Sequence, residues 1–195
     1  MSATNNVNGT NDSSSAGTVI GADHTQGSAA GNVTLGSGST VINGATIGGN
    51  IKVPAGTTLV LMNSTVGGGI TGTNAASITV CNTTVGGAVS ISGSTGFVLL
   101  GDPGDDGCAG NTFRSGITLS SNQGDVELGN NQTGNVSITG TTGTGPFPDD
   151  TGVEIEANHI GGTLSCSGNT PVASNDHQPN TVTGSRSGEC ASPTF

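Results

Sequence analysis

Two short segments of the chain each carry a pair of carboxylates separated by one residue. Asp125 and Glu127 form the first pair, and Glu154 and Glu156 form the second. Alternate side chains of an extended strand share a face, so each pair would project from one side of its strand. If the two strands are neighbours, about 4.8 Å apart, the four carboxylates form one acidic face. Like charges this close raise carboxyl pKa values or attract a cation.

This acidic face has several chemical uses, and the sequence does not decide between them. It could be a solvated surface, it could bind Ca²⁺ through its carboxylate oxygens, or it could bind or cleave a polysaccharide. Sugar hydrolysis needs two carboxyl groups about 5–9 Å apart, which neighbouring strands can provide. Lyases on this type of fold also use Arg or Lys, and Arg114 is the only basic residue near the centre of the chain. We therefore predict ligand binding at this face and name no catalytic residue.

A second acidic group lies in the turn-rich segment 101–110, which reads GDPGDDGCAG. Asp102, Asp105 and Asp106 could ligate Ca²⁺, because glycines permit the tight turns that bring side-chain oxygens together. The spacing matches neither the twelve-residue EF-hand loop nor the nonapeptide calcium repeat. A simple acidic loop is the alternative. No cofactor other than Ca²⁺ is suggested by the sequence.

The composition restricts the class of partner and the kind of core. The formal net charge is −10, with three Lys and Arg residues against thirteen Asp and Glu residues. Nucleic acids and anionic membranes attract proteins through basic patches, so neither is expected as a partner. No apolar run reaches about twenty residues, so no membrane insertion is expected. With 36 Gly, no Trp and no Tyr, the core must be built from small branched side chains.

A repeat of about nineteen residues organises the middle of the chain. Paired glycines recur at 48–49, 67–68 and 86–87, each followed by a segment in which polar and apolar residues alternate. The same frame can be followed from residue 31 to residue 166 and gives seven copies. Two steps are about ten residues longer, and each contains a turn-rich insertion, at 101–110 and at 141–150. Insertions confined to corners are typical of stacked repeats.

The repeat predicts an all-β, right-handed parallel β-helix of about seven coils, with roughly nineteen residues in each coil. A left-handed hexapeptide helix is the rival architecture, but it requires a stricter six-residue period. We divide the chain into a polar N-terminal cap or disordered segment (1–30), the repeats (31–166) and a C-terminal cap (167–195). The closing residues should fold back over the last coil, because an open coil exposes unpaired strand edges.

The corners of the coil are predicted to be structural. An Asn at the corner tolerates left-handed φ, and its amide can hydrogen-bond to the next coil and form a ladder. The paired glycines are expected to supply positive φ and room for a tight bend. The structural residues predicted in this way are Asn63, Asn82, Asn111, Asn158, Gly48, Gly49, Gly67, Gly68, Gly86, Gly87, Gly161 and Gly162.

Four cysteines bear on the compartment of the protein. They lack CxxC or metal-finger spacing. Order along a solenoid favours the pairs Cys81–Cys108 and Cys166–Cys190, with buried free thiols and zinc binding as alternatives. Disulfides would place the protein in an oxidising compartment, secreted or at the cell surface.

Two further outward surfaces are predicted. One is a row of mostly hydroxyl side chains, formed by Thr34, Lys52, Thr71, Ser90, Thr118, Ser137 and Ser165. Such a row suggests an ice- or surface-binding protein, but that function favours paired Thr-x-Thr rows, and the positions two residues earlier supply a partner only at Thr163. The other surface is apolar, with Leu59, Leu61, Phe97 and Leu99 expected to face outward and to support self-association.

The last part of the chain resembles a known family. The segment from Asn158 reads NHIGGTLSCSGNTP and is followed by QPNTVTGSRSGEC. It resembles the closing segment of secreted actinobacterial right-handed β-helix repeat proteins of undetermined function. The closing motif covers about 33 residues, and the looser coil pattern extends back to about residue 31. The resemblance implies an extracellular β-helix and supports the Cys166–Cys190 disulfide, but it implies no activity.

The sequence as a whole favours a non-enzymatic extracellular β-solenoid that is a structural, adhesive or interaction module of the cell surface. Serine is abundant, but no GxSxG nucleophile motif occurs. A glycan or another protein is the class of partner expected. A carbohydrate-binding or polysaccharide-cleaving β-helix is the first alternative, and an ice- or surface-binding protein is the second.

Overall fold

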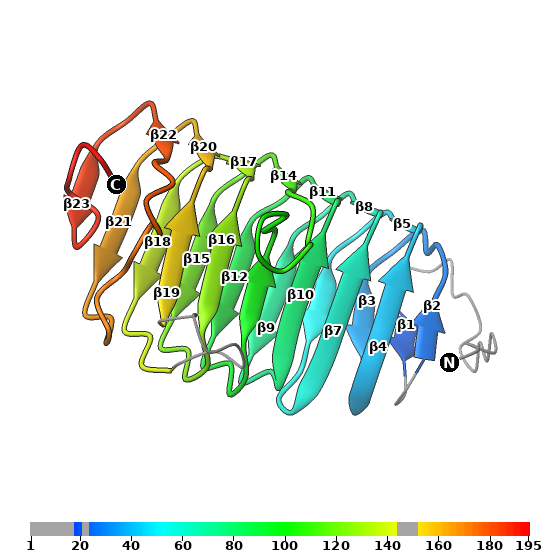
Figure 1. Cartoon of the computed structure of the whole chain (residues 1–195). Helices are drawn as coiled ribbons and strands as arrows, with labels where there is room; N and C mark the ends of the chain where they lie inside the picture. Colours follow the sequence, from blue (N-terminus) through cyan, green and yellow to red (C-terminus); the bar gives the residue numbers. More distant parts are fainter. Residues whose placement is uncertain (1–17, 21–23, 144–151) are drawn as a thin grey trace.

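The computed structural model describes residues 18–20, 24–143 and 152–195, and this part of the chain is all β without a helix. Three parallel sheets run along the molecule, and successive strands of the chain pass from one sheet to the next (Figure 1). The fold is a right-handed parallel β-helix, as the repeat predicted.

The sheets are named A, B and C. In stacking order, sheet A contains β1 (Thr18–Ile20), β3 (Val33–Leu35), β6 (Ile51–Val53), β9 (Ile70–Thr73), β12 (Val89–Ser92), β15 (Ile117–Ser120), β18 (Val136–Thr139), β21 (Leu164–Ser167) and β23 (Arg186–Gly188). Sheet B contains β2 (His24–Gln26), β4 (Gly38–Asn43), β7 (Thr57–Met62), β10 (Ser77–Cys81), β13 (Val98–Leu100), β16 (Val126–Gly129) and β19 (Val153–Glu156). Sheet C contains β5 (Thr46–Ile47), β8 (Thr65–Val66), β11 (Thr84–Val85), β14 (Thr112–Phe113), β17 (Gln132–Thr133), β20 (His159–Ile160) and β22 (Thr181–Val182).

The insertion at 101–110 leaves the strand register intact. Ile78 of β10 pairs with Val98 of β13, and Val98 pairs with Val126 of β16 on the far side of the insertion. The extra residues therefore leave the stack at a corner, as expected for a solenoid. The insertion predicted at 141–150 lies mostly outside the described residues.

Aligned branched side chains fill the narrow interior. The inner row of sheet B contains Leu59, Ile78, Val98, Val126 and Val153, all fully buried. Each such side chain contributes about 1.5–3 kcal/mol relative to an exposed one. The prediction that Leu59 and Leu61 face outward is wrong, because β7 pairs in register with β10 and places both leucines beside the buried Ile78 and Val80.

The paired glycines are required by close packing between coils. A Cβ on Gly67 would lie 2.5 Å from the carbonyl oxygen of Gly48, and a Cβ on Gly86 would lie 2.4 Å from that of Gly67. None of the eight predicted glycines, all of them in the described part of the chain, has a positive φ, so the expectation of positive φ was wrong. Their backbones approach the neighbouring coil too closely to admit a side chain. Gly161 is an exception, since its nearest neighbour would be 3.5 Å away.

Asparagine occupies two adjacent corner positions rather than one. Asn63, Asn82 and Asn130 have positive φ values of 51°, 47° and 57°. The residue after this position is buried, and in the later coils it is Asn111, Asn131, Asn158 and Asn180. In this buried ladder each Nδ2 donates to the Oδ1 of the next Asn at 2.9–3.0 Å. The single ladder predicted from the sequence is therefore divided into an exposed ladder through Asn63 and Asn82 and a buried one.

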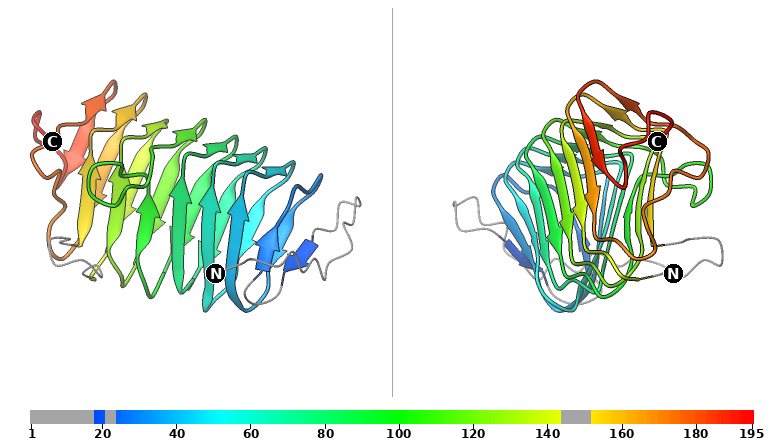
Figure 2. Two further views of the ribbon diagram at one scale, coloured as in Figure 1. Left: turned by 45° about the vertical axis from the view of Figure 1, so that its right-hand side comes forward. Right: turned by 90° about the vertical axis from the view of Figure 1, so that its left-hand side faces the viewer.

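Both predicted disulfides are present. Cys81–Cys108 fastens the 101–110 insertion to the end of β10, and Cys166–Cys190 ties β21 to the residues that follow β23. Beyond Cys166 the chain adds further strands to the stack, because β22 pairs with β20 and β23 pairs with β21. Phe195 is then buried near the end of the solenoid (Figure 2).

Candidate functional site

Carboxylates from three separate segments line one pocket on the outer side of sheet B. The lining residues are Asp102, Gly104, Asp105, Glu154, Glu156, Asp176 and Gln178. The cavity has a volume of about 300 Å³ and is called the acidic pocket below. The insertion at 101–110, strand β19 and the C-terminal segment each contribute to it. Two residues from each of the acidic groups that the sequence presented separately, Asp102 and Asp105 with Glu154 and Glu156, thus line a single site.

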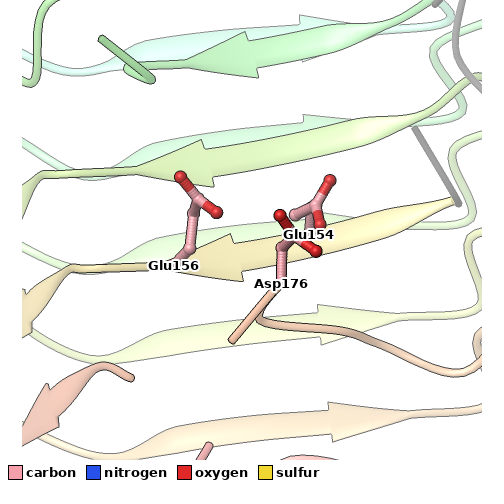
Figure 3. Close-up of side chains that lie close together, drawn as sticks. All are labelled: Glu154, Glu156 and Asp176. Carbon is pink, nitrogen blue, oxygen red and sulfur yellow. The ribbon is translucent and has the colours of Figure 1, made fainter. Parts of the chain in front are cut away.

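Strand alternation positions Glu154 and Glu156. Ile155 between them is fully buried in the core, so the two glutamates project from the other side of β19. Ser174 forms a parallel bridge with Glu154, which lays the C-terminal segment beside β19. This pairing brings Asp176 next to the two glutamates (Figure 3).

The 101–110 insertion is held by its own ends. Asp102 and Cys108 form an antiparallel bridge, and Cys108 is disulfide-bonded to Cys81. Oδ1 of Asp102 accepts a hydrogen bond from the N–H of Gly104 at 2.9 Å and another from the N–H of Asp105 at 3.3 Å. These bonds fix the turn, so that Asp102 is buried in the pocket and Asp105 is exposed at its edge.

Glu156 has the most perturbed acidity in the pocket. Its exposed fraction is 4%. Burial, together with the charges of Asp102, Asp176 and Asp105, raises the pKa of Glu156 to about 7. Nε2 of Gln178 donates a hydrogen bond of 3.0 Å to its Oε2. At neutral pH this carboxyl group is therefore divided between its acid and carboxylate forms.

The arrangement can bind a cation or transfer a proton. One carboxylate oxygen each from Glu154, Glu156 and Asp176 lies within 4.8 Å of the others. Carboxylate oxygens are the ligands that Ca²⁺ prefers, and Glu156 would have to ionise to contribute. A carboxylic acid beside a second carboxyl group is also the combination used in sugar hydrolysis. The Ca²⁺ site therefore stays a prediction, which calorimetric titration of metal-free protein would check.

Asp125 and Glu127 do not line the acidic pocket. Glu127 is the register partner of Glu154, as the hypothesis of an acidic face required. Both residues are buried, so a solvated surface does not describe this pair, and ligand binding at Asp125 and Glu127 stays a prediction. The 101–110 insertion stands over the outer side of sheet B (Figure 1). Asp102 lies so close to β16 that a Cβ on Gly129 would be 3.0 Å from its Cα.

Other differences concern residues outside the repeat. Asp106 belongs to the predicted calcium set but does not line the pocket. Asp176 and Gln178 line the pocket and were not predicted. Their segment has no glycine pair and no alternating strand, which are the features that align a segment with the repeat. The sequence therefore could not predict that it lies beside β19.

Neither a membrane-spanning helix nor a known relative points to the function of this protein within the described part of the chain. Among the described residues, no helix has the length and apolar character needed to cross a bilayer. Searches among protein-family models, curated proteins and solved structures found no match to this chain. No relative's activity can therefore be transferred to it, and its function has to follow from the pocket and the faces of the solenoid.

Proposed function

We propose that this protein is a non-enzymatic extracellular β-solenoid that serves as a structural or adhesive module of a cell surface. The observation that carries the proposal is the unbroken register of the three sheets across successive coils. Such a stack holds its outer side chains in rigid, repeated positions. A preorganised surface binds a partner with little additional loss of conformational entropy.

Two observations support the extracellular setting. Both pairs of cysteines form disulfides, which persist in oxidising compartments. The resemblance of residues 158–190 to secreted actinobacterial β-helix proteins points to the same setting.

The acidic pocket limits the chemistry of a soluble partner. It contains five carboxyl groups, and no Lys, Arg or His is among its lining residues. Anionic ligands would be repelled by this field. A neutral glycan or a basic segment of another protein is the partner class that the pocket favours.

Binding without turnover is the expected experimental result. Labelled protein is incubated with intact cells, with cell-wall fragments and with a panel of plant, algal and bacterial polysaccharides. We expect retention on a surface and no release of reducing ends or unsaturated products. Specific turnover of any glycan would reject the non-enzymatic function, and retention nowhere would reject adhesion.

A polysaccharide-cleaving enzyme is the second candidate, and the raised pKa of Glu156 beside Glu154 favours it. Glu156 would donate a proton to the leaving oxygen, and Glu154 would act as nucleophile or general base. The wild-type rate should then show a pH limb near 7. Glu156→Gln should abolish the rate, whereas Asp105→Asn at the pocket edge should retain a measurable rate. A double Glu154→Gln and Glu156→Gln variant with an unchanged rate would exclude this candidate.

A further inference from the structure

Sheet A carries two parallel rows of hydroxyl groups on its outer side. One row was expected from the sequence, and the second lies two residues later on the same strands. Strand by strand, the pairs are Thr71 and Thr73, Ser90 and Ser92, Thr118 and Ser120, Ser137 and Thr139, and Ser165 and Ser167. These ten residues are called the hydroxyl array. The positions two residues before the first row, where a partner row was expected, lie at the corners of the coil and carry a hydroxyl only at Thr163.

The array is continuous over five consecutive coils. Ser90 pairs in register with Thr71 on one side and with Thr118 on the other, and the first row continues to Ser137 and Ser165. The second row follows the same pairing from β9 to β21. The residue between the two hydroxyls is buried in every one of these strands, so the core fixes both rows facing outward.

The hydroxyl groups of the array, all in the described part of the chain, leave their hydrogen bonds to solvent. Neighbouring strands are about 4.8 Å apart, and residues two apart on one strand are about 6.7 Å apart. Within the described part of the chain, none of the ten hydroxyls hydrogen-bonds to another residue, whereas on sheet B Ser77 Oγ and Thr58 Oγ1 are 3.3 Å apart and bonded. Ten donors and acceptors therefore face solvent on a rectangular grid.

The array is neutral although the protein is strongly acidic. The net charge is −10, but strands β9, β12, β15, β18 and β21 contain no charged residue. Lys52 on β6, the register partner of Thr71, bounds the array at one end, and Ser187 on β23, the register partner of Ser165, follows it at the other. A charged or polyionic partner would find no complementary group here. The face suits an uncharged, hydrogen-bonding partner with a regular repeat.

We infer that the hydroxyl array is a binding surface for crystalline ice. Ice presents uncharged oxygens on rectangular grids whose repeats are close to the two spacings of the array. Water molecules bound along both rows can then join the crystal lattice without rearrangement. This inference rests on the proposed role as a surface-binding module and names the surface and the binding face.

Crystalline polysaccharide is the nearest rival occupant. Proteins that bind flat sugar surfaces stack aromatic rings on them, because a sugar ring offers an apolar face to an aromatic side chain. The chain has no Trp and no Tyr, and none of its four Phe residues lies in the array. The chemistry of the face therefore favours ice over cellulose or chitin.

Ice growth in the presence of the full-length protein tests the inference. Single ice crystals are grown in concentrated protein solution, and the fraction of fluorescently labelled protein that enters slowly grown ice is measured. Thr118→Lys in the first row and Ser92→Lys in the second row place bulk and charge on the array. Thr65→Lys is the matched control, because Thr65 is an exposed threonine on sheet C. Thermal unfolding of each variant verifies that it is folded.

We expect the wild-type protein and Thr65→Lys to produce faceted crystals and to enter the ice, and both array variants to lose these properties. Ordinary unfaceted growth with the wild-type protein would overturn the inference. So would an equal loss in Thr65→Lys, or activity that survives both array substitutions. Retention on crystalline chitin or cellulose without an effect on ice would assign the face to a polysaccharide. Failure on ice combined with adhesion to cells and no glycan turnover would reject this inference and leave the proposed function intact.

Discussion

The side-chain amide of Asn131 donates a hydrogen bond of 3.0 Å to Oδ1 of Asn158 in the next coil. The same nitrogen donates to the carbonyl oxygen of Leu100 at 2.6 Å, and Oδ1 of Asn131 accepts from the N–H of Asn111 at 2.8 Å. All of these groups are buried. One side chain thus joins three coils through bonds that water cannot replace.

The first prediction concerns this residue. Asn131→Asp removes the donor, turns an acceptor toward the oxygens of Asn158 and Leu100, and buries a charge. We expect the free energy of unfolding to fall by about 3 kcal/mol, because buried polar groups left without partners cost about 1–3 kcal/mol each. Chemical denaturation measures the change. Asn63→Asp in the exposed ladder is the control and should cost less than 1 kcal/mol, and equal costs for the two variants would contradict the distinction between the ladders.

The second prediction separates close packing from backbone conformation at the paired glycines. Gly67→Ala would place a Cβ 2.5 Å from the carbonyl oxygen of Gly48, so two coils must move apart. We expect a loss of about 2 kcal/mol, which is typical of overpacked sites. Gly161→Ala tests the same corner where the nearest atom is 3.5 Å away, and thermal unfolding should show little change. Similar destabilisation by both substitutions would argue against coil-to-coil packing as the cause.

The third prediction concerns the C-terminal end of the solenoid. Oε1 of Glu189 accepts from the N–H of Asn169, and Oε2 accepts from Nδ2 of Asn169 and from the N–H of Ala173. Although burial raises the pKa of Glu189, these bonds together with one from Gly168 outweigh burial and hold it below its usual range. The stability that this carboxylate contributes is therefore present above pH 4.5 and is lost as the pH falls through the lowered pKa.

Replacing this carboxylate should loosen the end of the stack. We expect Glu189→Gln to cost about 1 kcal/mol at pH 7 and to cost less as the solution is acidified. Hydrogen exchange should locate the loss in residues 168–195, with Asp106→Asn as a control at a different half-buried acid. An unchanged exchange pattern in the C-terminal segment would show that Glu189 does not hold it.

The fold could be predicted because its determinants are local and repeated. Alternation in 77–80 and 125–128 places every second residue in the core. Where one coil is ambiguous, the equivalent repeat positions of the other coils indicate which of its residues face inward. Leu59 and Leu61, which were predicted to face outward and are buried, show where local alternation fails. In the coil that contains Leu59 and Leu61, a run of apolar residues from 59 to 62 gives no alternation, so only pairing with the neighbouring coils decides which side is buried.

The acidic pocket could be predicted only in part. The spacing of Glu154 and Glu156 places both on one side of a strand, and their stacking beside Glu127 follows from the repeat. The approach of Asp102 and Asp176 depends instead on an insertion and on a tail, whose paths are set by bridges and a disulfide rather than by periodicity. The burial of Glu127 could not be predicted for the same reason. The repeat predicts on which side of the strand its side chain lies, but it does not predict which segment covers that side.

The last prediction uses the pH dependence of the acidic pocket. The pKa of Glu156 rises from 4.5 to about 7 in the folded protein, so between these values the folded state binds more protons than the unfolded state. The stability linked to this proton is fully present below about pH 4.5 and is lost as the pH rises through 7. Glu156→Gln keeps an oxygen for the hydrogen bond from Gln178 and cannot ionise. We therefore expect the variant to match the wild-type protein near pH 5 and to exceed its stability at pH 8 by about 2 kcal/mol, a value reduced from full linkage because solvent reaches the pocket.

Thermal and chemical unfolding between pH 5 and pH 8 measure this difference, and other titrating groups cancel when the two proteins are compared. Asp176→Asn is the informative control, because the charge of Asp176 contributes to the raised pKa of Glu156. When Asp176→Asn is present in both proteins, the stability difference caused by Glu156→Gln should persist, but its midpoint should lie at lower pH. A difference that does not vary with pH would show that Glu156 is ionised throughout the range, and the acid–carboxylate chemistry considered for this pocket would lose its physical basis.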